Sequence, residues 1–426
     1  MEVYQKTNIL LDPSGDTFHR AVGITLQGGQ IFGLFPVSGI LNKNSNKIRF
    51  RWISIKVLYY FYIFIFQTIH LMLSLRRAVR VEMSFGVFAA VFFYFVTLLG
   101  GFIIFQKAKN WLKIVKRIEL TEKIFLHPPY RQVGFSMRRK VRLVTLILLI
   151  GGVAEHMMYF STKFINAKAQ LEKCNLQLPV LEHFLKTERR HLFSILPYNT
   201  VLALLFEWSN ICITICWSYM DVFISLFTCS MAYRFRQITD RMKRARFQTM
   251  PDSFWIEIRS HFTDLTNLLN YLDKQLASLI IIACGNNLYF ICQQLFNSFE
   301  VTSDALNAAY FLVSLMYIIC RTLTMLFFAA SVNEAAKEPY QMLKALPYTS
   351  WSTEIQRFSD QLISEVIGFS GNRFFFITRT LILALIGTIV TYELVLLDHI
   401  TEPPEIIQNS CYIAYLNAHH QANWTA

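Results

Sequence analysis

The chain has 426 residues, of which 54% are hydrophobic, 15% are aromatic and only 16% are charged. Its mean hydropathy of +0.36 excludes an ordinary soluble protein. Several apolar runs of about 18 or more residues predict membrane-spanning helices, because a backbone in lipid must satisfy its own hydrogen bonds. The first part of the chain is polar and contains no long apolar run, so we expect no cleavable signal peptide.

The formal net charge of +13 raises the question of nucleic-acid binding, which the positions of the 41 Lys and Arg residues argue against. These residues gather between the apolar runs, so we interpret the charge as a topology signal and expect no nucleic-acid partner. Six of the eight cysteines lie within apolar runs, and none has the paired spacing of a zinc site. Cys174 and Cys411 fall in loops and remain available for a disulfide. We expect no metal and no other cofactor.

The N-terminal segment, 1–51, is predicted to be cytoplasmic. Its apolar part, from Ala21 to Leu41, contains five glycines and a proline, which disfavours a transmembrane helix. We expect this part to lie at the membrane interface or to pack on the helix bundle. The first four spans are predicted within 52–231, with a mixed-charge loop from Lys163 to Leu196 between the third and the fourth.

The fourth helical pattern is longer than a bilayer requires and leads into a basic segment, 232–276. Apolar residues recur there at helical spacing outside the membrane, so this helix needs a partner surface. Spans five and six are predicted within 277–332. A second amphipathic segment, 333–372, precedes the seventh span, 373–398, and the tail, 399–426, follows it. The expected class is therefore all-α with seven spans.

An odd number of spans places the two termini on opposite faces of the membrane. Of the 41 Lys and Arg residues, 28 lie on the side that holds the N-terminus and nine lie on the other side. Because cytoplasmic loops carry an excess of Lys and Arg, the N-terminus is predicted to be cytoplasmic and the C-terminus extracellular. This orientation is opposite to that of a G-protein-coupled receptor.

The last span has a narrow stripe of mostly small and polar residues at helical spacing. Two interpretations stay open. The stripe could let a neighbouring helix pack closely, or it could line a water-filled pore shared by several subunits, with the terminal carboxylate forming a ring that attracts cations. The stripe consists of Thr380, Ala384, Thr388, Thr391, Val395 and Asp398.

Polar side chains within the predicted spans are candidates for ligand binding, because buried polar groups in lipid usually have a function or a partner. Carboxylates, amides and histidine can hydrogen-bond the hydroxyls of a sugar while aromatic rings cover its C–H surface. An amine ligand is the alternative, since two of the groups are acidic. The candidates, all predicted in the outer half of the bundle, are Glu155, His156, Glu207, Trp208, Asn210, Gln293, Gln294, Tyr310 and Tyr317.

Several candidates also have a purely structural interpretation. His156 could be an interhelical hydrogen-bonding group, and Trp208 could belong to an interfacial aromatic belt. Gln293 and Gln294 are adjacent, so we expect at most one of them to face a pocket. Arg321, in the sixth span, needs an acidic or carbonyl partner. Asp221 and Glu393 are both candidates for that partner.

Three stretches of the chain resemble the insect gustatory receptors. Thr391 to Leu397, TYELVLL, resembles the signature ending of that family, although Asp398 and His399 follow it where Gln-Phe is usual. The stretches FGLFPVSG, at 32–39, and RFFFITR, at 373–379, resemble the sugar-receptor branch. The resemblance implies a ligand-gated cation channel, a homo- or heterotetramer with other gustatory receptor subunits. The last helices would line a central pore, Val395 would correspond to the hydrophobic constriction, and the cytoplasmic segments 232–276 and 333–372 would form the inter-subunit anchor.

The sequence contains no Gly-rich phosphate loop, no Gly-x-Ser-x-Gly and no HExxH motif, so we expect no enzymatic activity. The favoured function is a sugar-gated, non-selective cation channel in the plasma membrane of chemosensory neurons. The alternatives are a polyol transporter and a metabotropic seven-helix chemoreceptor. We find no internal repeat and no matching pair of Gly- or Pro-broken spans, which disfavours the transporter. The orientation disfavours the metabotropic receptor.

Overall fold

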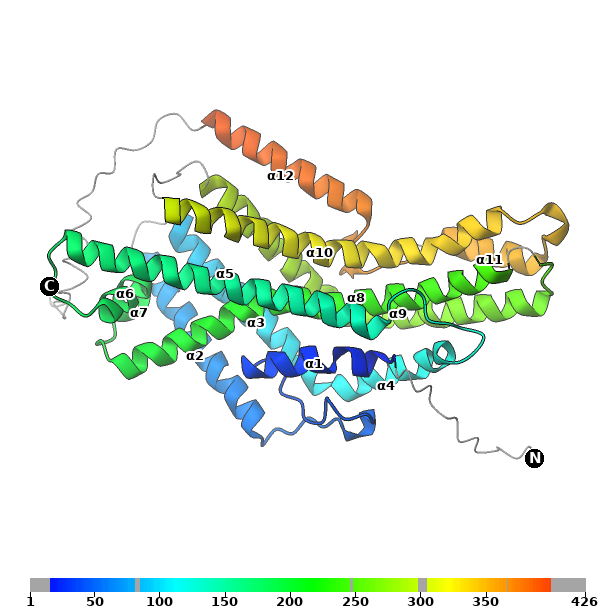
Figure 1. Cartoon of the computed structure of the whole chain (residues 1–426), viewed down its shortest axis with the longest axis horizontal. Helices are drawn as coiled ribbons and strands as arrows, with labels where there is room; N and C mark the ends of the chain where they lie inside the picture. The colour runs from blue at the N-terminus through cyan, green and yellow to red at the C-terminus, as the bar shows by residue number, and fades with distance from the viewer. Residues whose placement is uncertain (1–15, 81–84, 246–247, 298–304, 365, 400–426) are drawn as a thin grey trace.

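The computed structural model describes residues 16–80, 85–245, 248–297, 305–364 and 366–399, and most of them are helical (Figure 1). This confirms the expected helical class, apart from a hairpin of two very short strands. In chain order the elements are α1 (Phe18–Ile31), η1 (Ser45–Lys47), α2 (Ile55–Arg80), α3 (Phe85–Lys109), α4 (Trp111–Glu122), η2 (Lys123–Leu126), α5 (Met137–Lys173), α6 (Val180–Glu188), α7 (Arg190–Phe193), α8 (Thr200–Ala245), α9 (Asp252–Asn297), α10 (Ala305–Lys344), η4 (Tyr348–Ser350), α11 (Thr353–Ser364), β1 (Ser370–Gly371), β2 (Phe375–Phe376) and α12 (Arg379–His399).

Within the described residues, six helices are long and apolar enough to cross a membrane: α2, α3, α5, α8, α9 and α10. They coincide with the first six predicted spans. α8 forms the core of the bundle, because 83% of its most apolar window is buried inside the chain, against 22% for α5. The bundle leaves the apolar outer surfaces of the other helices exposed, as expected where lipid replaces water as the solvent.

Three of these helices project well beyond a bilayer. α8 and α9 each have 46 residues, and α10 has 40. At 1.5 Å per residue, a helix of 46 residues is about 69 Å long, more than twice the thickness of a hydrocarbon core of about 30 Å. The expected boundary between an extramembrane helix and the fifth span, near Leu276, is absent because α9 is continuous. Its buried residues keep one helical phase across that point, from Leu272 through Leu276 to Leu279.

The expectation of a loop from Lys163 to Leu196 is wrong. α5 continues to Lys173, and α6 and α7 follow at the same end of the bundle (Figure 1). Phe184 and Leu185 of α6 bury their side chains in a small core together with Ala167 of α5 and Ala203 of α8. The mixed charge of the segment concealed this amphipathic pattern. We refer to this end of the molecule as the α6–α7 end.

The segment before the first span packs on the bundle, which is one of the two placements expected for it. Ala21, Val22 and Leu26 of α1 are completely buried. The Thr25 hydroxyl donates to Thr145 Oγ1 of α5 at 3.1 Å. A side chain at Gly29 would have its Cβ 2.7 Å from the ring of Tyr219 in α8, so glycine is what allows α1 to lie this close to the core helix.

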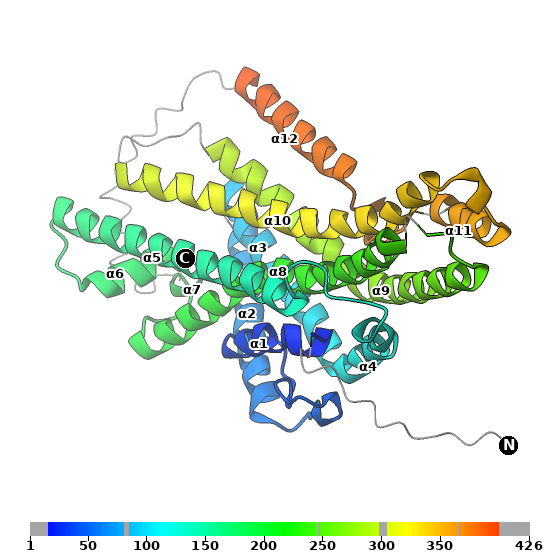
Figure 2. The same cartoon turned by 45° about the vertical axis from the view of Figure 1, so that its right-hand side comes forward.

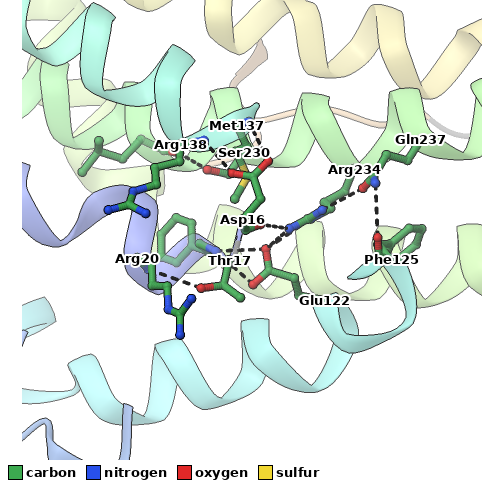
Figure 3. Close-up of polar contacts among 12 residues, drawn as sticks. Asp16, Thr17, Arg20, Glu122, Phe125, Met137, Arg138, Ser230, Arg234 and Gln237 are labelled. Atoms are coloured by element: carbon green, nitrogen blue, oxygen red, sulfur yellow. Dashed lines mark hydrogen bonds and ion pairs between the residues drawn. The ribbon is translucent and has the colours of Figure 1, made fainter. Parts of the chain in front are cut away.

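A buried polar network fixes the start of α1 to α4, α5 and α8 (Figure 3). The Asp16 carboxylate accepts hydrogen bonds from the first two backbone N–H groups of α5, at 2.9 and 2.8 Å. The Glu122 carboxylate does the same for the first N–H of α1, at 3.0 Å. Carboxylates stabilise helix N-termini in this way because those N–H groups lack intrahelical partners. Arg234 of α8 donates to the Asp16 carbonyl at 2.8 Å and to Glu122 Oε1 at 3.2 Å.

The last helix begins later than predicted. The expected start at Arg373 is wrong, because 370–376 forms the β1–β2 hairpin, whose turn residues Asn372 and Arg373 have φ values of 50° and 62°. α12 starts at Arg379, and its apolar part, Arg379–Tyr392, is shorter than the six spans. In Figures 1 and 2, α12 diverges from the bundle along its length. Leu381, Ile382 and Leu385 hold its first turns against the core.

Candidate functional site

The candidate carboxylate of α5 is bound by hydroxyl groups from α10. Glu155 Oε1 accepts from Tyr310 OH at 3.2 Å and from Ser314 Oγ at 2.8 Å. Gln294 Nε2 of α9 donates to the same serine oxygen at 3.1 Å. The structure therefore brings together Glu155, Tyr310 and Gln294, three of the residues predicted from sequence. We call these residues and Ser314 the Glu155 cluster. It joins α5, α9 and α10 at a single point within the apolar bundle.

A second cluster contains a buried ion pair, Arg189 with Glu207. Arg189 Nε and Nη2 lie 3.0 and 2.9 Å from the two carboxylate oxygens of Glu207. Glu207 was a candidate ligand-binding residue, and in this structure its carboxylate is fully engaged by the arginine. Next to the pair, Tyr159 OH donates to Glu188 Oε2 at 2.6 Å. We call Arg189, Glu207, Glu188 and Tyr159 the Arg189 cluster.

The two clusters meet through aromatic rings. The ring of Tyr159 lies 6.0 Å from that of Tyr310 and 5.8 Å from the imidazole of His156. His156 is buried, and its Nε2 has no hydrogen-bond partner among the described residues. The same holds, within that part of the chain, for the buried Oε1 atom of Gln293. His156 neighbours Glu155, and an unpaired polar group is costly where it is buried.

Sequence reasoning missed Arg189, Tyr159 and Ser314. Arg189 was not considered because it lies in the segment that was expected to be a loop outside the membrane. The available signal was Glu207 itself, because a carboxylate within a span requires a counter-charge. Lys186, Arg189 and Arg190 were the nearby basic residues from which a partner could have been chosen.

Three further candidates point away from the Glu155 cluster. Trp208 is 39% exposed on the outside of α8, and its Nε1 donates to Tyr59 OH at 2.9 Å. Asn210 Oδ1 accepts from Tyr94 OH at 3.3 Å. Tyr317 OH donates to the Leu148 carbonyl at 2.9 Å. Residues 207, 208 and 210 diverge because successive residues project about 100° apart around α8. The outward side chain of Trp208 agrees with its structural interpretation, and the contacts of Asn210 and Tyr317 lie outside the Glu155 cluster.

Asn210 lies near a pair of buried histidines. His70 Nδ1 and His191 Nε2 are 3.0 Å apart and share a hydrogen bond, and the ring of Tyr94 stacks on His70 with centroids 5.0 Å apart. Burial, followed by the positive charges of Arg189 and Arg77, lowers the pKa of His191 to about 3. His191 is therefore neutral at physiological pH and connects α7 to α2.

Deeper in the bundle, Arg321 of α10 pairs with Asp221 of α8. The Nε–Oδ2 distance is 2.9 Å, a charge contact without the alignment of a hydrogen bond. Arg321 also donates to Ser218 Oγ at 2.6 Å and to Asn287 Oδ1 at 3.1 Å. Among the described side chains, Asp221 is therefore the acidic partner of Arg321. The other candidate, the side chain of Glu393, lies outside the described part of the chain.

The polar stripe of α12 faces away from its own bundle. Thr388 and Thr391 are exposed and donate their hydroxyls to the carbonyls of Ala384 and Gly387, each at 2.9 Å. Val395 is 51% exposed. Asp398 belongs to α12, but its side chain lies outside what the structure describes. The stripe is not alone in its exposure, because Leu383, Ile386 and Val390 are exposed as well. α12 contacts α9 and α10, and its residues that pack on the core are Leu381, Ile382 and Leu385.

The structure also bears on metal and cysteine chemistry. Within the described residues, no group of three or more His, Cys, Asp or Glu side chains could hold a metal ion. Six cysteines there are free: Cys212, Cys216, Cys229, Cys284, Cys292 and Cys320. Cys174 is disulfide-bonded. Cys411, which the sequence left available as its partner, lies outside the described residues.

Residues 5–411 match the trehalose receptor family. In Drosophila melanogaster, the gustatory receptor for sugar taste 64b is 35% identical over 92% of this chain and 97% of its own length. The gustatory receptor for sugar taste 64a is 33% identical, over 90% and 84%. Gustatory receptor 5a for trehalose is 28% identical, over 92% and 87%.

Solved structures show a similar fold. The insect olfactory receptor OR5 from Machilis hrabei superimposes with a TM-score of 0.61 at 13% identity, covering 89% of this chain and 97% of that one. Its complex with eugenol gives a TM-score of 0.62. The chain shares the fold of that receptor, and its six apolar helices are those of a multi-pass membrane protein. The chain belongs to the trehalose receptor family, in the sugar branch of the insect gustatory receptors. This is a family of receptors rather than of enzymes.

Proposed function

We propose that this chain senses sugars and is a subunit of a ligand-gated, non-selective cation channel in the plasma membrane of chemosensory neurons. Relatives named for sugar taste and for trehalose support the ligand class. The observation that carries the proposal is the Glu155 cluster, in which a carboxylate, two hydroxyls and an amide meet inside an apolar bundle. These are the groups that bind vicinal hydroxyls.

In this proposal, sugar hydroxyls replace protein hydroxyls at Glu155. Tyr310 OH and Ser314 Oγ now occupy the carboxylate, and two neighbouring hydroxyls of a sugar can donate in their place. The Tyr159 and Tyr310 rings would cover the C–H surface, and His156 would gain a partner. Because the replaced contacts join α5 to α10, ligand binding changes how these two helices pack. Glu207 would remain with Arg189.

The proposed pore follows from α12. We propose a seventh span in α12, a cytoplasmic N-terminus, an extracellular C-terminus and a homo- or heterotetramer with other gustatory receptor subunits. The exposed stripe with Thr388, Thr391 and Val395 would line the shared axis. A valine constriction closes a pore by dewetting, and Asp398 would concentrate cations. In the proposal, movement of α10 reaches the start of α12 through Arg379 Nη2, which donates to Glu334 Oε2 at 2.6 Å.

Expression of this chain alone in oocytes tests the function. A sugar-evoked cation current that persists when G-protein signalling is blocked supports the channel. Accumulation of radiolabelled sugar without current would instead show a polyol transporter. A response that disappears with G-protein block would show a metabotropic receptor. Epitope tags at the two ends, probed on intact cells, test the topology, and staining of an N-terminal tag without permeabilisation would contradict it.

A further inference from the structure

We propose that the surface beside the start of α2 binds the phosphate-bearing head group of an anionic phospholipid in the cytoplasmic leaflet. We call this surface the basic platform. It is formed by Lys43, Lys47, Arg49 and Arg51, with Trp52 and Ile53 next to them. Its placement at the inner leaflet rests on the proposed cytoplasmic N-terminus.

The charge of this segment is entirely positive. Residues 17–56 contain six Lys and Arg and no Asp or Glu. Lys43, Lys47, Arg49 and Arg51 are all exposed. One carboxylate approaches from α4, that of Glu119, and its Oε2 already accepts from Ser45 Oγ at 2.8 Å and pairs with Lys116 at 3.2 Å. The platform therefore lacks a neutralising partner of its own among the described contacts, and an anionic leaflet attracts such clusters.

Backbone and side-chain contacts order the platform, which includes the end of the short helix η1 at Lys47. Ser38 and Arg49 form an antiparallel bridge, with N–O distances of 2.9 and 3.0 Å. Gln30 Nε2 donates to the carbonyls of Phe35 and Val37 at 3.0 and 2.6 Å. Gly39 has a φ of 80°, and a Cβ there would lie 2.1 Å from the Lys47 carbonyl. The backbone that carries the basic residues is thus ordered before any lipid arrives.

Exposed apolar side chains adjoin the basic residues. Trp52 is 56% exposed, Ile53 is 99% exposed and Ile55, the first residue of α2, is 83% exposed. Trp52 is fixed between Phe50 and Phe105, with ring centroids 5.3 and 5.9 Å away. Because α2 is a candidate span, these side chains lie where a chain enters lipid. Tryptophan favours that head-group level, and basic residues there face the lipid phosphates.

A hollow of about 190 Å³ lies at the edge of the platform, lined in part by Gln27, Leu41, Asn42 and Lys56. Lys56 Nζ donates to Gln30 Oε1 at 2.7 Å and to the Val37 carbonyl at 3.2 Å. Within the described part of the chain, its charge in the hollow has no carboxylate contact. A polar head group with phosphates fits this lining. The acyl chains would then run along the exposed apolar surface of α2, which includes Leu58, 70% exposed.

The purified full-length chain in detergent micelles tests the proposal by thermophoretic titration. The probes are dioctanoyl phosphatidylinositol bisphosphate, dioctanoyl phosphatidylcholine and free inositol trisphosphate. The test variant is K43Q/K47Q/R49Q/R51Q. The control variant, K123Q/K274Q/K337Q/K344Q, removes the same charge from exposed lysines elsewhere in the chain. Size-exclusion profiles establish folding, and the pairs K43Q/K47Q and R49Q/R51Q serve if the fourfold variant aggregates.

We expect the anionic lipid to bind saturably, the choline lipid to bind weakly, and the test variant to lose about tenfold or more in affinity while the control does not. Three results would each overturn the proposal: equal affinity for the two lipids, an undiminished affinity in the test variant, or trisphosphate binding as tightly as the lipid. The last result would assign the surface to a soluble phosphate. No sugar or current enters this assay, so its failure is separate from a failure of the proposed channel function.

Discussion

Arg189 and Glu207 form a two-point ion pair within the α6–α7 end, with N–O distances of 3.0 and 2.9 Å. Their exposed fractions are only 6% and 5%. Arg189 belongs to the connection between α6 and α7, and Glu207 belongs to the core helix α8. The pair therefore ties a segment outside the spans to the centre of the bundle.

Replacing Arg189 with Gln should strongly destabilise the protein, because it leaves the Glu207 carboxylate buried without a counter-charge. Removing one member of a buried pair typically costs about 3–5 kcal/mol. The melting temperature and the surface expression of R189Q should both fall, whereas R189Q/E207Q should recover part of each. The control is K186Q, which removes a salt bridge at 2.7 Å on α6. Equal loss in the single and the double variant would mean that the pair is not the cause.

Replacing Glu155 with Gln should weaken the response to sugar while leaving the fold intact. A hydrogen bond to a charged carboxylate contributes about 1–2 kcal/mol more than a hydrogen bond to a neutral amide. The half-maximal sugar concentration should rise about tenfold with little change in maximal current. E172Q is the matched control, since Glu172 lies on the same helix with a side chain 70% exposed. An unchanged dose–response curve for E155Q would remove this carboxylate from the sugar site.

Cysteines on the stripe of α12 should react with aqueous thiol reagents when sugar is present. Thr388→Cys and Thr391→Cys lie on the exposed face, whereas Ile382→Cys, at a position 2% exposed, lies against the bundle and serves as the control. The native exposed Cys320 is first replaced by serine. Block of the current at 388 and 391, but not at 382, is the expected pattern. Conducting channels that the reagent leaves untouched at 388 and 391 would contradict a pore along this stripe.

Replacing Asp398 with Asn should reduce divalent cation permeation and block, because a ring of carboxylates raises the local cation concentration. The measurement is the reversal potential and the calcium block of the sugar-evoked current. D360N, on the exposed surface of α11, is the control for a simple change of net charge. Identical permeation in D398N and the native protein would place this carboxylate away from the ion path.

Acidification should destabilise the α6–α7 end through His191. The pKa of His191 in the folded protein is about 3, below the value of about 6.5 for an unfolded chain. Between these values the unfolded state binds more protons, so stability falls as the pH decreases through this window. The loss from this group alone is about 2 kcal/mol at pH 5.

The melting temperature of H191Q should therefore depend less on pH than that of the native chain between pH 7 and pH 4. This range covers most of the interval between the two pKa values. Glutamine can still hydrogen-bond His70, so the variant retains the contact between α7 and α2. H127Q, outside the spans, controls for the number of histidines. A melting curve for H191Q that shifts with pH as much as the native curve would show that another group dominates.

The family and the main helices could be predicted from the sequence, because both depend on local patterns. The length of the apolar runs at 52–75 and 84–106 predicts membrane spans whatever their tertiary contacts. The TYELVLL ending indicated the family. The boundaries were predicted less well. α9 continues through Leu276 because its buried face stays in phase, and the last helix starts at Arg379 because the backbone at Asn372 and Arg373 turns first.

The sequence by itself determined that this is a membrane protein, because its long apolar runs would be exposed unfavourably to water if they were not surrounded by lipid. It also determined which polar groups are present in the spans. Only the tertiary structure decided which of them meet: Glu155 reaches Tyr310 across 155 positions of the chain, whereas Trp208, next to Glu207, faces outward. Contacts of this kind depend on helix rotation and packing, and residues distant in sequence contribute to both.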